Sequence, residues 1–160
     1  MRIFFKTAFF MLACFFIQSG FAQKPAGKKP ATATQKFKPP KLYTTLGSFK
    51  DSTGVPLEQA LNIIAMPLKI VDDKNTEYRV SSYQFLYKRR VVTEDEQTGK
   101  VSPASSILSN RFTSTPLPEI WVNNIGQELK AGEELFFFDV IARDAQGRVI
   151  NASSLKIIVQ

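Results

Sequence analysis

The sequence has almost none of two residue types that carry much of protein chemistry. Its 160 residues include a single cysteine, Cys14, and no histidine. Cys14 lies in an N-terminal segment that we expect to be removed, so the mature chain would have neither residue. That composition excludes disulfide bonds, thiolate nucleophiles, histidine acid–base chemistry and the usual zinc or copper ligand sets. The mature domain must therefore be stabilised by its hydrophobic core alone.

The N-terminus has the pattern of an export signal. Two basic residues are followed by an apolar run at residues 9–17 and then by small residues. An apolar run of about nine residues is too short for a membrane anchor, which needs about 20. The spacing is typical of a signal-peptidase site. We expect residues 1–22 to be a signal peptide cleaved between Ala22 and Gln23, and a lipoprotein acylated at Cys14 is the alternative.

The predicted export also indicates a location. Small domains of the eukaryotic secretory route are commonly stapled by disulfides, so export without them favours a bacterial protein. No second apolar run approaches membrane-spanning length. We therefore expect a soluble mature protein in the periplasm, with an outer-membrane-associated or extracellular location as the alternatives.

The formal charge of +7 is concentrated in one short segment. Residues 23–41 hold six lysines, several prolines and no acidic residue, whereas residues 42–160 hold 13 basic and 14 acidic residues. A neutral domain lacks the basic face of a nucleic-acid-binding protein, so we expect no nucleic-acid partner. Residues 23–41 are too polar to fold alone and are predicted to be a disordered linker. This linker is either a passive spacer or an electrostatic contact with acidic envelope components.

The first half of the domain alternates short apolar runs with turn residues. We predict a strand at residues 42–50 and a short helix that begins after Pro56. Residues 62–71 are interrupted by Pro67, which favours an edge strand or a bulge over a central strand.

The middle of the chain contains the second strong strand signal. Residues 78–92 alternate between two faces, as expected for a long strand. A turn at residues 97–100 allows a return strand to start at Val101, but the polar residues 102–110 are predicted to be a loop. A short helix is predicted at residues 118–125, ended by Gly126.

The last third of the chain predicts the heart of the fold. It contains a strongly apolar strand at residues 134–142, a turn at residues 144–147, and two further strands at residues 148–152 and Leu155–Val159. Many short strands with one or two brief helices indicate a single all-β domain at residues 42–160. The predicted fold class is an antiparallel, immunoglobulin-like or Greek-key β-sandwich.

Asp139 is the most conspicuous single residue, because it is a carboxylate inside an apolar strand. It could face solvent, pair with a cation or accept backbone N–H groups, and a buried, unpaired carboxyl would be neutral. Catalysis would need a second acid or a nucleophile nearby, and no motif supplies one. We therefore predict a structural role for Asp139.

Other residues are candidates for partner contact or modification. The basic triplet Lys88, Arg89 and Arg90 and the single tryptophan, Trp121, could contact a partner. Ser52 lies in a short Asp-Ser-Thr sequence that resembles an O-glycosylation signal of exported Bacteroidetes proteins. The sequence contains no phosphate loop, serine elbow or calcium loop, so no catalytic residue, metal site or cofactor is predicted.

The C-terminal block resembles a known family. The spacing of Gly132, Asp139 and Gly147 around the apolar strand is similar to that in the last domain of the gliding-motility and type IX secretion protein GldM, also called PorM. Residues 78–85 and 108–112 also resemble that family's pattern. GldM is a periplasmic shaft built from stacked β-domains and anchored by inner-membrane helices. This chain has one domain and a predicted cleavable signal, so the resemblance implies a free single-domain relative.

These observations lead to one functional expectation and two alternatives. We expect a non-enzymatic envelope-binding or adaptor protein whose partners are envelope proteins, including ring or shaft subunits of that machine. Binding by edge-strand pairing is expected, with Leu155–Val159 as the predicted edge. The alternatives are a type IX secretion cargo or sorting domain, and a carboxylate-dependent hydrolase of envelope glycans.

Overall fold

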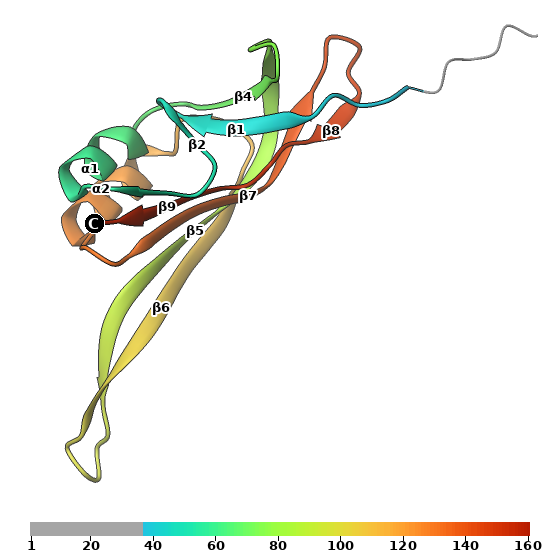
Figure 1. The fold of residues 1–160 in the computed structure, drawn as a ribbon. Helices are drawn as coiled ribbons and strands as arrows, with labels where there is room; N and C mark the ends of the chain where they lie inside the picture. Colours follow the sequence, from blue (N-terminus) through green and yellow to red (C-terminus); the bar gives the residue numbers. More distant parts are fainter. Residues whose placement is uncertain (1–36) are drawn as a thin grey trace, which may run out of the picture. The chain divides into compact units, whose positions relative to one another are not determined.

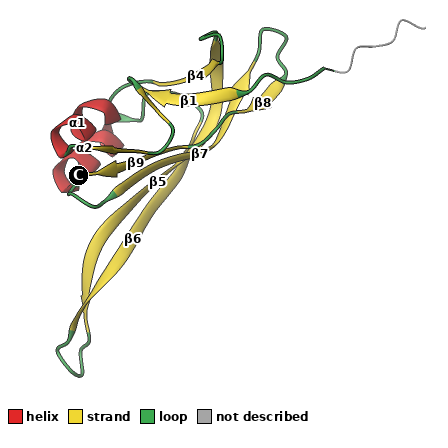
Figure 2. Ribbon diagram, viewed as in Figure 1, coloured by secondary structure: helices red, strands yellow, loops and turns green. Residues whose placement is uncertain are grey.

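The computed structural model describes residues 37–160 and shows a strongly curved, mostly antiparallel β-sheet with two short helices beside it (Figures 1 and 2). The predicted fold class, an all-β sandwich with one or two short helices, is confirmed. The signal-peptide cleavage site and linker residues 23–36 lie outside the described residues. In chain order the elements are β1 (Leu42–Leu46), β2 (Phe49–Lys50), β3 (Thr53–Val55), α1 (Leu57–Ile64), β4 (Leu68–Asp72), β5 (Glu77–Glu94), β6 (Val101–Phe112), α2 (Glu119–Glu128), β7 (Glu134–Arg143), β8 (Val149–Asn151) and β9 (Leu155–Val159).

The sheet has the strand order β2-β1-β4-β5-β7-β9-β3, with β6 added beside β5 and β8 beside β7. All strand pairs are antiparallel except β3–β9. The sheet curls toward a barrel because Leu42 bridges to Ala152 and accepts a 2.9 Å hydrogen bond from the N–H of Ser153. The predicted docking edge is wrong, since β9 lies inside the sheet between β7 and β3.

The structure corrects three further predictions that were made from the sequence. The first strand is broken into β1 and β2 by a turn at Gly47, whose φ of +60° suits glycine. Pro67 precedes β4 rather than interrupting it, and β4 lies between β1 and β5 instead of at an edge. Gly126 does not end α2, which continues to Glu128 because burial of Ile125 outweighs the weak helix propensity of one glycine.

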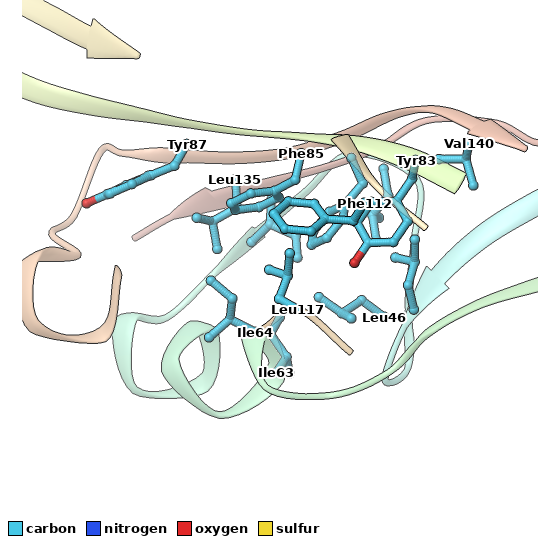
Figure 3. Packing of buried hydrophobic residues seen from close by; sticks show 14 of the residues in the cluster. Leu46, Ile63, Ile64, Tyr83, Phe85, Tyr87, Phe112, Leu117, Leu135 and Val140 are labelled. Atoms are coloured by element: carbon cyan, nitrogen blue, oxygen red, sulfur yellow. The ribbon is translucent and has the colours of Figure 1, made fainter. Parts of the chain in front are cut away.

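The core fills the space between the sheet and the two helices (Figure 3). Phe85 of β5 lies at its centre, with its ring centroid 4.9 Å from that of Phe137. Trp121 of α2 packs edge-on against both Phe85 and Phe112, at 5.9 and 5.4 Å. Ile64 of α1 points toward the same aromatic group (Figure 3). Such tilted and edge-to-face pairs add to the stabilisation that apolar burial provides.

Two bulges change which residues of β5 and β7 face this core. In β7, Leu135 and Phe137 are buried and the next buried residues are Val140 and Ala142, so the alternation shifts at Asp139. The φ of Asp139 is +46°, an unusual value for a residue other than glycine. Matching register shifts occur opposite it, at residues 80–84 of β5. The strict alternation predicted for residues 78–92 is therefore wrong on the N-terminal side of Tyr83.

Candidate functional site

The most prominent surface feature is a two-stranded arm formed by the ends of β5 and β6 (Figure 1). Beyond Lys88, β5 pairs only with β6, so the hairpin projects past the rest of the sheet. Residues 102–110, predicted to be a loop, form most of β6 instead. The tip is closed by Asp95, whose carboxylate accepts the N–H groups of Thr98 and Gln97, and these bonds lower the pKa of Asp95.

β6 is an edge strand along its whole length. Its 12 residues pair with β5 on one side, and in the described part of the chain no strand pairs with the other side. An unpaired edge offers a row of backbone N–H and C=O groups to an incoming strand. Two adjacent apolar residues, Ile107 and Leu108, are exposed on it. Residues 101–110 carry no charge, so this edge lacks the lysines that commonly block strand addition.

A small apolar depression lies between this edge and helix α2. Its volume is about 110 Å³. Residues of β5, β6 and α2 line it: Tyr87, Leu108, Trp121, Asn124, Ile125 and Glu128. The α2 residues are three or four positions apart and therefore share one helix face. Trp121, a candidate partner contact from the sequence, is half-buried and forms part of this wall.

The root of the arm is fixed by a buried carboxylate that sequence reasoning did not single out. Glu133 is 2% exposed. Its carboxylate accepts hydrogen bonds from the Tyr87 hydroxyl at 2.5 Å, the Lys130 N–H at 2.9 Å and the Arg90 N–H at 3.1 Å. Three donors satisfy a buried carboxylate, so Glu133 ties β5 to the turn before β7. Contact with Glu133 contributes to a raised pKa of Tyr87, after burial as the larger cause.

The basic triplet at the arm's root is largely engaged within the domain. Lys88 lies 3.3 Å from Glu134, and Arg89 forms an ion pair with Glu128 of α2. The guanidinium of Arg90 lies over Gly132, close to where a β-carbon would stand. These contacts hold α2 and the start of β7 against the arm.

Asp139 lines a shallow hollow on the sheet face opposite the core. The hollow has a volume of about 520 Å³. Its wall is formed by Arg111, Phe136, Phe138, Asp139, Val140, Ile141, Asn151, Ala152 and Ser154. Asp139 is exposed and accepts a 2.6 Å hydrogen bond from Gln84 Nε2. Among these lining residues Asp139 is the sole carboxylate.

The remaining residues singled out in the sequence lie in turns. Gly147, with φ +78°, closes the β7–β8 hairpin. There, burial of Asp144 opposes ionisation, but hydrogen bonds from Arg148 outweigh it and lower the pKa of Asp144. The guanidinium of Arg148 also stacks on Phe37, 3.6 Å from its ring centroid. Ser52 is exposed in the bend between β2 and β3.

Residues 37–160 contain neither a metal-binding cluster nor a membrane-spanning helix. No group of three or more acidic side chains in this range could hold a metal ion. Neither helix in it has the length and hydropathy needed to cross a lipid bilayer.

One signal in the sequence could have revealed β6. The long strand predicted before the turn at residues 97–100 needs a partner, and a hairpin return of similar length was the simplest source. Glu133 gave no comparable signal, because two consecutive glutamates before a strand do not indicate which one turns inward.

Two comparisons with known proteins found no relative of this chain. The chain matches no protein-family model and no curated protein sequence.

Proposed function

We propose that this chain is a non-enzymatic binding or adaptor protein of a bacterial cell envelope, and that its β5–β6 arm binds a partner protein. The observation that carries the proposal is the free edge of β6, 12 residues long and uncharged over residues 101–110. Strand addition at such an edge provides affinity through main-chain hydrogen bonds. Proteins that do not use a long edge normally protect it with charge, proline, a bulge or a covering element, and of these β6 carries one proline, Pro103, close to the tip of the arm.

The position of Phe37 on the domain is consistent with an adaptor. Phe37, the first described residue, stacks against Arg148 of the β7–β8 hairpin. That hairpin and the tip of the arm lie at opposite ends of the domain (Figure 1). A chain entering at one end leaves the other end free to reach a partner.

Kinship with the GldM domain is part of this proposal and rests on the spacing of three residues. The three residues on which the resemblance rests all have positive φ: +85° at Gly132, +46° at Asp139 and +78° at Gly147. A positive φ strongly restricts the residue type, so their spacing follows from turns and a bulge rather than from chemistry. On this basis we propose a periplasmic location and partners in the gliding-motility or type IX secretion machinery.

The two alternative functions have less support. Hydrolysis of glycans by paired acids needs two facing carboxylates, and the hollow at Asp139 is lined by one. No described feature specifically favours a secretion cargo or sorting domain.

Site-specific photo-crosslinking in intact cells tests the proposal. A photoreactive phenylalanine analogue would replace Val101 on the arm, with Val149 on β8 as the control, because the two valines are similarly exposed at 59% and 57%. We expect covalent adducts with envelope proteins at position 101 and none at position 149, with secretion or gliding subunits identified by mass spectrometry. Equal adducts at both positions, or none at 101, would reject the arm as the binding element.

A further inference from the structure

The free edge of β6 and the depression beside α2 share Leu108, and we call the two together the groove. Leu108 belongs to both, since it lies on the edge strand and lines the depression with Trp121 and Ile125. A groove between an edge strand and a helix suits strand addition, because the edge supplies main-chain hydrogen bonds and the wall receives alternate side chains. The groove can therefore discriminate between partner segments by their side chains, which an exposed edge alone cannot do.

The depression defines the size of the side chain that it can receive. Its volume of about 110 Å³ is enclosed by an indole ring and an isoleucine on one side and by Leu108 on the other. A cavity of about 150 Å³ accommodates benzene. A leucine, isoleucine or valine side chain fits this smaller space better than an aromatic ring does.

A charge at one end of the edge defines a second requirement. Arg111 donates a 3.0 Å hydrogen bond from Nη2 to Ser82 Oγ and forms no ion pair with any described residue. Its guanidinium retains further donors, which suit a carboxylate. Leu108 and Arg111 are three residues apart and so point to opposite faces of β6. Their neighbours on β5 agree, because Tyr87 faces the core and Gln84 faces the hollow.

We infer that this groove binds an extended segment of a partner protein, added as a strand to β6, in which an aliphatic and an acidic residue stand three positions apart. The aliphatic side chain enters the depression beside Leu108, and the acidic side chain meets Arg111 on the opposite face. This inference rests on the proposed function and adds the chemistry of the partner segment.

Charge argues against two other occupants. A second copy of β6 contains no acidic residue and would bring no carboxylate to Arg111. The chain's own linker, residues 23–41, also has no acid and carries six lysines. A segment of a different, locally acidic protein is the occupant that complements the groove.

Binding of synthetic peptides to the purified protein tests the inference. The probes are threonine-rich ten-residue peptides in which a leucine and a glutamate stand three positions apart, made in both orders because the added strand can be parallel or antiparallel. Fluorescence anisotropy would measure their affinity. Control peptides replace the leucine by alanine or the glutamate by lysine, and we expect each change to weaken binding by about tenfold.

Two adjacent asparagines of α2 provide a matched pair of protein variants. Both are exposed, but Asn124 lines the depression and Asn123 does not. Asn124→Trp should fill the depression and weaken binding of the glutamate peptide by about tenfold or more, and Asn123→Trp should change it less than about twofold. Arg111→Glu should weaken the glutamate peptide and restore binding of the lysine peptide.

The outcomes separate this inference from the proposed function. Equal binding by the two tryptophan variants, or no effect of replacing leucine by alanine, would overturn the inference. So would a dimer in analytical ultracentrifugation that Asn124→Trp dissociates, since the occupant would then be a second copy. Absence of peptide binding with retained crosslinks at position 101 would overturn the inference alone, whereas absence of the crosslinks would overturn the proposed function.

Discussion

Replacing Glu133 by glutamine should destabilise the domain far more than the same change at its neighbour, Glu134. The Glu133 carboxylate is buried and accepts three hydrogen bonds, including one from the Arg90 N–H. A glutamine side chain has one acceptor oxygen. Its amide nitrogen would therefore face at least one of the three donors and could not accept that donor's hydrogen bond. A hydrogen bond to a charged group contributes about 1.5–3 kcal/mol, and an unsatisfied buried donor costs about 1–3 kcal/mol. We expect Glu133→Gln to reduce the free energy of unfolding by about 2 kcal/mol.

Chemical denaturation and thermal unfolding followed by circular dichroism would measure the effect. For a domain of this size, about 2 kcal/mol corresponds to a fall in Tm of roughly 8 °C. Glu134→Gln is the control, because Glu134 forms ion pairs with Lys88 and Lys156 at 3.3 Å that are partly exposed and contribute about 0–1 kcal/mol each. A double-mutant cycle with Tyr87→Phe should show coupling between Glu133 and Tyr87. Equal stability of the two glutamine variants would refute the view that Glu133 fixes the root of the arm.

Three further predictions concern the sheet. Truncation after Ser154 removes β9, whose apolar side chains are buried between β7 and β3, and should abolish the cooperative unfolding transition; an unchanged Tm would contradict the strand order. Asp139→Val should destabilise the domain by about 1–2 kcal/mol more than Asp139→Gly in urea denaturation, because a β-branched residue tolerates a φ of +46° poorly, and equal values would remove the bulge argument. Burial raises the pKa of Tyr83 to about 12, so the unfolded chain loses this proton first, near its ordinary pKa of about 10. Tyr83 alone should leave the free energy of unfolding unchanged below about pH 10 and lower it by roughly 2 kcal/mol as the pH rises to 12. Tyr87, whose pKa is also raised, adds to this decline. Tyr83→Phe should flatten that decline, and an identical pH profile for the variant would contradict the assignment.

The sequence pattern predicted the strands in the last third of the chain because each of them shows its alternation of apolar and polar residues within its own segment. Leu155, Ile157 and Val159 alternate with less buried residues, and all three are buried as expected. The same reasoning failed for β6, since an edge strand with a polar face and a half-exposed second face has no apolar period to detect. β6 exists because β5 supplies a hydrogen-bonding partner along its whole length.

The bulges show a second limit of pattern reasoning. Alternation along β5 and β7 assumes an uninterrupted pleat, whereas these paired strands both shift register near Asp139. The sequence identified Asp139 as unusual and predicted a structural role. It could not show that the backbone turns the carboxylate outward, because that depends on a register set jointly by two strands about 55 residues apart.

The sequence by itself determined the all-β class, the positions of most turns and the absence of histidine and cysteine chemistry beyond residue 22. These properties depend on composition and on short-range periodicity, which each segment carries within itself. Only the tertiary structure decided that Glu133 is buried, that β9 is internal and that β6 has a free edge beside α2. Burial and edge exposure depend on which distant segments pair, and the sum of long-range packing energies determines that pairing.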